Sequence, residues 1–144
     1  MKVVLDTNVY VSAFIKPSSP PGRILDALVA ARFDVVLSDA ILNEVTGVLD
    51  RPQVARYLRR PPLWTAEFLV ALRRAARLVE PTIVRAVAAD PADDLILGTA
   101  IAGAADYLVS GNNHLLDLGS FQGIPIVTPR QFLDILALSD EPAP

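Results

Sequence analysis

Short apolar runs alternate with helix-like segments along this chain, and this alternation limits the fold more than any other feature. Four runs have the length and apolar character of buried strands, at residues 3–5, 34–38, 107–109 and 124–127. Strands that alternate with helices form a parallel sheet with helices on both of its faces. We therefore predict an α/β fold in three layers, α/β/α, with a central parallel sheet of about four to five strands.

Helical periodicity and capping residues place helices between and after these runs. Ser38 or Asp39, for example, can cap the helix that follows the second run. The predicted helices cover residues 20–33, 39–51, 53–78 with a break at the two prolines 61 and 62, 95–105, and a stretch from 129 onward. No linker or repeat divides the chain, so we expect one domain over residues 1–137 and a frayed tail over 138–144.

The residue types that are scarce exclude several classes of protein. The 144 residues include no Cys and a single His, His114. This composition excludes disulfide scaffolds, thiol nucleophiles, Cys-ligated zinc and His-rich metal sites. No apolar run approaches the ~20 residues of a membrane span, and the first residues lack the pattern of a signal peptide. We therefore expect a cytoplasmic protein with no membrane partner.

The formal net charge is −3, but the basic residues are concentrated in one stretch. Between residues 51 and 77 there are seven arginines and one acid, Glu67, which gives this stretch +6 and the rest of the chain −9. Such asymmetry is typical of a surface that binds phosphates, although a chain this rich in Ala, Pro and Arg also places arginine on any exposed helix face. Both interpretations stay open on the charges. Under the first, Arg56, Arg59 and Arg60 are the candidate contacts to the phosphates of a nucleic acid.

Acidic side chains stand near the ends of the predicted strands, where open parallel sheets bind ligands. Asp6 directly follows the most apolar run, and Glu44 lies near the apolar stripe of the helix after the second run. Asp93 and Asp94 stand just before the segment 95–105, where acids often serve only as helix caps. Clustered carboxylates raise each other's pKa unless a cation lies between them. Together these acids predict a site for a hard divalent cation that activates water against a phosphodiester.

Five segments agree in order and spacing with one known family. They are KVVLDTNV from residue 2, the glutamate at 44, DPADD from residue 90, ADYLVSGN from residue 105 and IVTPRQFL from residue 126. They resemble the PIN domain family over about residues 1–136, in particular the branch of toxin components of toxin–antitoxin pairs. The resemblance implies a Mg²⁺- or Mn²⁺-dependent endoribonuclease that cleaves single-stranded RNA. It also implies a PIN-like fold, an antitoxin partner and a homodimer.

The resemblance also implies roles for individual residues. Carried over by position, Asp6, Glu44 and Asp93 are the catalytic acids and the metal ligands. Asp94, the neighbour of Asp93, could share its role as a ligand. Polar residues at four further positions are expected to support the carboxylates or the metal-bound waters through hydrogen bonds. They are Thr7, Asn8, Ser110 and Asn112.

The fourth acid of the family pattern is missing. This chain has Asn112 after the Ser–Gly turn and His114 two residues later, where family members commonly carry acids. An asparagine oxygen can ligate a cation but brings no charge, so the alternative is a catalytically weakened PIN-fold module that binds RNA or a partner. Two other classes fit less well. A flavodoxin-like phosphotransfer domain needs a lysine beyond Lys16, and a haloacid-dehalogenase-like phosphatase needs an aspartate in place of Asn8.

Overall fold

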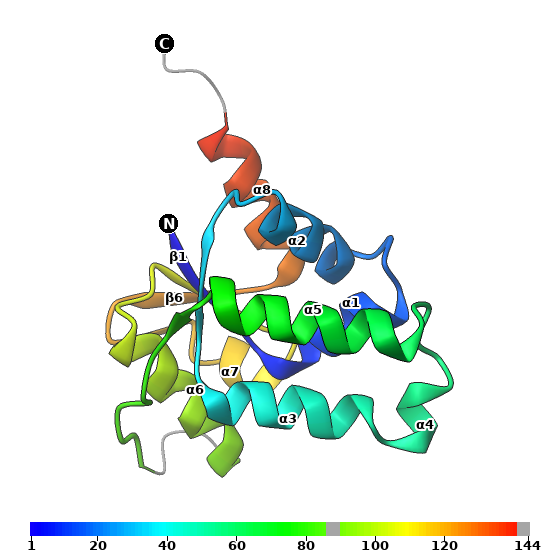
Figure 1. Cartoon of the computed structure of the whole chain (residues 1–144). Coiled ribbons are helices and arrows are strands. Elements are labelled where there is room, and N and C mark those ends of the chain that lie inside the picture. Colours follow the sequence, from blue (N-terminus) through cyan, green and yellow to red (C-terminus); the bar gives the residue numbers. More distant parts are fainter. Residues whose placement is uncertain (86–89, 141–144) are drawn as a thin grey trace.

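The computed structural model describes residues 1–85 and 90–140, which form alternating strands and helices (Figure 1). The strands are β1 (Lys2–Leu5), β2 (Asp34–Leu37), β3 (Arg77–Leu78), β4 (Tyr107–Val109), β5 (Ser120–Phe121) and β6 (Ile124–Val127). The helices are α1 (Thr7–Ile15), α2 (Pro20–Val29), α3 (Asp39–Leu49), α4 (Pro52–Ala55), α5 (Pro62–Ala75), α6 (Pro91–Ala102), α7 (Asn113–Leu116) and α8 (Pro129–Ser139). Among these described helices, none has the length and apolar character of a membrane span.

The six strands form one sheet in the order β3-β2-β1-β4-β6-β5. All neighbouring strands are parallel except β5, which pairs antiparallel with β6 at one edge. Strand β1 is central, and its Val4 pairs with Val36 of β2 and with Leu108 of β4. These three valine and leucine side chains are fully buried. A strand that is covered on both faces is apolar on both, which explains the continuous apolar runs of the sequence.

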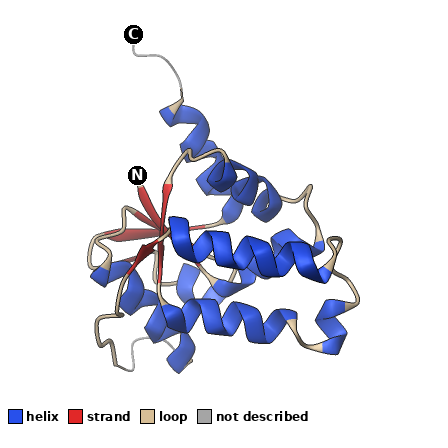
Figure 2. Cartoon of the chain, viewed as in Figure 1, coloured by secondary structure: helices blue, strands red, loops and turns tan. Residues whose placement is uncertain are grey.

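The order of the strands puts helices on both faces of the sheet. The chain steps from β1 to β2 to β3 through α1 to α5, and then returns past β1 to β4 through α6. Because parallel crossovers are right-handed, crossovers in opposite directions lie on opposite faces. Helix α8 packs against α2, and Figure 2 shows the strands gathered between helices. The predicted three-layer α/β/α architecture is confirmed.

The structure contains elements that the sequence pattern did not predict. Helix α1 follows β1 directly, but five of its nine residues are buried, so it lacks the one-sided apolar stripe that indicates a surface helix. The two-residue strands β3 and β5 lie at the sheet edges, which brings the strand number to six. The predicted helix over 53–78 is replaced by α4, α5 and β3, and α6 begins four residues earlier than predicted, at Pro91. Leu138 and Ser139, predicted as tail, belong to α8.

Candidate functional site

Asp6 stands at the C-terminal end of the central strand, at the start of α1. Its backbone N–H donates to the carbonyl oxygen of Val109 on β4 at 2.9 Å, which extends the parallel pairing by one residue. The side chain does not cap α1. Instead its Oδ2 accepts a hydrogen bond of 2.7 Å from the Ser110 hydroxyl, and the residue is only 4% exposed. Asp6 is therefore a buried carboxylate held by the Ser110 hydroxyl and by the backbone N–H of Thr7.

Asp93 is a second buried carboxylate, in the first turn of α6. Asp90 is the N-cap of this helix, and its Oδ1 accepts from the backbone N–H of Ala92 at 3.0 Å. Because Asp90 makes the cap, Asp93 is left to other partners. Its two carboxylate oxygens accept from the side-chain amide of Asn112, at 3.1 and 3.2 Å. Asp93 is 5% exposed.

The turn after β4 supplies the partners of both buried acids. The backbone N–H of Asn112 donates to the Ser110 hydroxyl oxygen at 2.9 Å, and the Asn112 Oδ1 accepts from the backbone N–H of His114 at 2.9 Å. On the other side of the turn, Asn8 of α1 accepts from the Gly111 N–H at 3.4 Å. The turn thus connects the end of β4 to the starts of α1 and α7.

Asp6, Asn8, Asp93 and Asn112 line one cavity of about 250 Å³ at the carboxyl ends of β1 and β4. Glu44 and Val48 of α3 complete its wall, and Glu44 is exposed at the rim. None of the described residues that line this cavity is a lysine or an arginine. The lining residues are Asp6, Thr7, Asn8, Val11, Glu44, Val48, Asp90, Ala92, Asp93 and Asn112. The three predicted catalytic acids therefore share one cavity, which we call the acidic cavity.

Electrostatics in the acidic cavity disfavour negative charge. The pKa of Asp6 is raised from 3.8 to about 6, mainly by burial and to a smaller extent by the negative charges of Asp93 and Glu44. Hydrogen bonds from the Ser110 hydroxyl and from the Thr7 backbone N–H act in the opposite direction and lower this pKa. Burial also raises the pKa of Asp93, with the charge of Asp90 adding to it and the Asn112 hydrogen bond opposing it. A positive ion in this cavity would favour the charged form of these carboxylates.

Comparison with known proteins assigns this arrangement to a family. A PIN domain family model matches residues 2–114. The chain belongs to the PIN domain family. It is 26% identical over 142 residues to the uncharacterised protein MJ1680 of Methanocaldococcus jannaschii, a match that covers 93% of this chain and 90% of the relative. The crystal structure of VapBC2 from Rickettsia felis, bound to a DNA fragment from its promoter, has a similar fold, with a TM-score of 0.57 and 17% identity over 89% of this chain and 98% of that chain.

The donor set of this PIN domain fits a hard divalent cation in chemistry. Carboxylate oxygens are the ligands that Mg²⁺ and Mn²⁺ prefer. None of the described residues that line the acidic cavity carries a cationic side chain. Within residues 1–85 and 90–140, however, no three His, Asp or Glu side chains come close enough to ligate a single ion. Asp6, Glu44 and Asp93 thus share the cavity without forming a closed set of ligands.

Two groups of predicted site residues lie outside the acidic cavity of the PIN domain. Asp94 lines a separate cavity of about 190 Å³ beside the segment 81–84. Arg56 and Arg60 place their guanidinium groups over aromatic rings, of Tyr57 at 4.8 Å and of Trp64 at 4.6 Å. Asp90, which sequence reasoning did not select, does line the acidic cavity. Its place in the DPADD segment was the sequence feature that could have identified it. An aspartate that caps a helix, however, cannot be told from one that lines a site by sequence alone.

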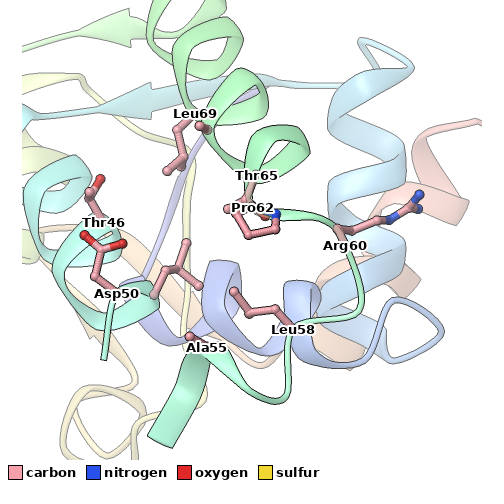
Figure 3. Close-up of a pocket in the computed structure, with 10 residues that line it drawn as sticks. Thr46, Asp50, Ala55, Leu58, Arg60, Pro62, Thr65 and Leu69 are labelled. Atoms are coloured by element: carbon pink, nitrogen blue, oxygen red, sulfur yellow. The ribbon is translucent and has the colours of Figure 1, made fainter. Parts of the chain in front are cut away.

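The PIN domain has a larger cavity of about 440 Å³ between α3, α4 and α5 (Figure 3). Its walls are mostly apolar, from Leu49, Leu58 and Leu69, and Figure 3 shows Arg60 pointing away from its centre. The hydroxyl of Thr65, which also lines it, is buried and has no hydrogen-bond partner within the described part of the chain. This cavity brings no pair of acids together, so the acidic cavity remains the candidate active site.

Proposed function

We propose that this PIN domain is a Mg²⁺- or Mn²⁺-dependent endoribonuclease that cleaves single-stranded RNA and acts as the toxin of a toxin–antitoxin pair. The observation that carries the proposal is the acidic cavity. Two nearly fully buried carboxylates, Asp6 and Asp93, line it together with Glu44, and no lysine or arginine stands among the described lining residues. Membership of the PIN domain family supports the same assignment.

In this proposal Asp6, Glu44 and Asp93 hold the cation. When bound, the ion supplies a water of lowered pKa and stabilises charge on the phosphate under attack. The chain's own groups keep the acids in place: the Ser110 hydroxyl holds Asp6 at 2.7 Å, and the Asn112 amide holds Asp93. Glu44, on α3, is exposed at the rim of the cavity, whereas Asp6 and Asp93 are buried. Asp94 is a weaker candidate ligand because it lines a different cavity.

The RNA would be held by Arg56, Arg59 and Arg60, which lie between α4 and α5 and are all exposed. Exposed rings accompany them, since Tyr57 is 53% exposed and Trp64 is 36% exposed. Basic side chains that alternate with aromatic rings suit single-stranded nucleic acid, because phosphates pair with the former and bases stack on the latter. These residues stand outside the acidic cavity, so they would contact nucleotides that flank the scissile bond.

A toxin requires a partner that silences it. The fold of this chain is shared with a protein of the VapBC2 assembly of Rickettsia felis, which supports a small antitoxin as the partner. We propose that the antitoxin inserts a segment into the acidic cavity, that the protein is a homodimer, and that it acts in the cytoplasm.

Cleavage of single-stranded RNA in Mn²⁺ by the Asp6→Asn variant tests the proposal. We expect the substitution to abolish cleavage, because it removes the most buried ligand, and to leave the metal-free melting temperature equal or higher, because it removes a buried charge. Asp134→Asn is the matched control, since Asp134 is exposed on α8 and is not among the residues that line the acidic cavity, so its cleavage should equal that of the wild type. If the Asp6→Asn variant still cleaves RNA, the metal-dependent mechanism proposed here is wrong.

A second candidate function is a PIN-fold module that binds RNA or a partner with weakened or no catalysis. It is favoured by the amide of Asn112 at the place of the fourth acid, and by the lack of three acids within ligating distance of one ion in the described residues. A binding module of this kind would shift RNA in a gel without cleaving it in Mn²⁺. Cleavage that depends on Asp6 would exclude it.

A further inference from the structure

We infer that Asn112 is a positioning residue that holds Asp93 by donating hydrogen bonds, and that it does not offer its side-chain oxygen to a cation. This inference rests on the proposed function, because it concerns how the acidic cavity receives its ion. It assigns to Asn112 a role different from that of the acid for which it stands.

The orientation of the Asn112 amide follows from its two partners. One end of the amide accepts from the backbone N–H of His114 at 2.9 Å, and only the oxygen can accept. The NH₂ group must therefore face Asp93, where it lies 3.1 Å from Oδ1 and 3.2 Å from Oδ2. A carboxylate can only accept, so the opposite orientation would leave both contacts unmade. The oxygen is committed to capping α7 and is not free to ligate.

The same residue also connects the two buried acids. The backbone N–H of Asn112 donates to the Ser110 hydroxyl, which in turn donates to Asp6. A continuous chain of hydrogen bonds thus runs from Asp93 through Asn112 and Ser110 to Asp6. Every link has a donor facing an acceptor, which is the condition under which a buried polar network fixes its members in place. Asn112 sets the position of Asp93 relative to Asp6 across the cavity.

The charge of the cavity follows from this arrangement. An aspartate at position 112 would put a carboxylate oxygen about 3 Å from those of Asp93, where the amide nitrogen now lies. Two carboxylates at that distance do not both ionise readily without a cation between them. Asn112 replaces this repulsion by attraction. The cavity is therefore ordered before an ion binds. It carries one negative charge fewer than it would with an aspartate at position 112, so its affinity for the ion is lower.

The substitution Asn112→Asp tests the inference, because it changes a single group. Aspartate keeps the backbone N–H to Ser110 and an oxygen that can cap α7, and it replaces only the NH₂ donor by an oxygen. Without metal we expect a lower melting temperature than the wild type. With Mn²⁺ we expect binding about tenfold tighter, since cation affinity rises with the number of charged ligands. The matched control is Asn113→Asp, which adds the same charge at the neighbouring exposed residue and should change neither result.

Two further measurements keep the inference testable if Asn112→Asp folds poorly. The exchanged pair Asp93→Asn with Asn112→Asp restores a donor opposite a carboxylate, so its metal-free melting temperature should return toward that of the wild type. In the wild type, hydrogen exchange of the His114 backbone N–H should be unchanged by Mg²⁺, because Asn112 keeps its capping oxygen in place. Faster exchange of that amide in Mg²⁺ would show that the oxygen has left the cap to ligate, and would overturn the inference.

The outcomes separate this inference from the proposed function. If the wild type binds Mn²⁺ and Asn112→Asp binds it no more tightly, the charge missing at position 112 does not limit cation binding, and the inference fails while the proposed function stands. If the wild type takes up no Mn²⁺, the proposed function fails. The hydrogen-bonding role is then still decided by the metal-free melting temperatures of Asn112→Asp and of the exchanged pair.

Discussion

Asp6 is buried at the end of the central strand while facing the negative charges of Asp93 and Glu44. Its pKa of about 6 means that it ionises near neutral pH at a cost that the Ser110 hydroxyl only partly offsets. The difference from its ordinary value of 3.8 corresponds to about 3 kcal/mol. A carboxylate of this kind is poorly suited to stabilise the fold and well suited to receive a cation.

The stability of the metal-free protein should depend on pH through Asp6. Its pKa is higher in the folded state, so between about pH 6 and pH 3.8 the folded protein binds more protons than the unfolded chain. The contribution of Asp6 to the free energy of unfolding is therefore greatest below about pH 3.8 and falls as the pH rises toward 6. Urea unfolding at several pH values should show the fall in the wild type and a smaller one in Asp6→Asn. Equal slopes in the two proteins would contradict the burial of Asp6 as a charged group.

Single residues differed in how well the sequence could predict them. Asp6 could be predicted because it follows a strand at the ligand-binding edge of the sheet. The choice of Asp93 rather than Asp94 came from the resemblance to the PIN domain family, because both acids stand at a helix start. Asp90 was missed because its capping role has the same sequence signal as any helix start. The orientation of Asn112 was beyond sequence reasoning, because it is set by the backbone N–H of His114 and by the position of Asp93, 19 residues earlier.

At the scale of elements, α6 is fixed by a close approach to the segment before it. The Thr82 N–H donates to the Gly98 carbonyl at 3.0 Å, and a Cβ on Gly98 would lie 2.1 Å from the Thr82 carbonyl oxygen. Glycine lowers the intrinsic stability of a helix interior, so its presence here is explained by packing. Since Asp93 lies in the first turn of α6, this contact also helps to place a carboxylate in the acidic cavity.

Two glycine substitutions test this packing as a matched pair. Gly98→Ala should lose about 2 kcal/mol of unfolding free energy, because backbone must move to admit the methyl group. Gly47→Ala in α3 should gain about 1 kcal/mol, because nothing lies within 4 Å of the added Cβ and alanine favours a helix. Urea unfolding measures both. If Gly98→Ala proves as stable as Gly47→Ala, the close approach of α6 to Thr82 is wrong.

At the scale of the whole molecule, the acidic cavity exists because the sheet order places β4 beside β1. The hydrogen bond from Ser110 to Asp6 joins residues 104 positions apart in the sequence. The α/β class and the three layers could be predicted from the alternation of apolar runs and helical periods. The edge strands β3 and β5 could not be predicted, because a strand of two residues is too short to show a periodic pattern. Helix α1 could not be predicted either, because it is buried on more than one side and lacks a one-sided apolar stripe.

The cavity also explains why cation binding should be a property of the folded molecule rather than of any segment. Its lining residues come from the end of β1, from α1 and α3, from the start of α6 and from the turn after β4. An unfolded chain separates these carboxylates, so an ion that binds them binds the native state preferentially and stabilises it.

Calorimetric titration of the metal-free protein with Mn²⁺ tests the central claim most directly. We expect the wild type and the exposed control Asp134→Asn to take up the ion with equal affinity, and Asp6→Asn to lose this uptake while remaining folded. The claim is contradicted if the wild type takes up no Mn²⁺, or if Asp6→Asn binds it as the wild type does.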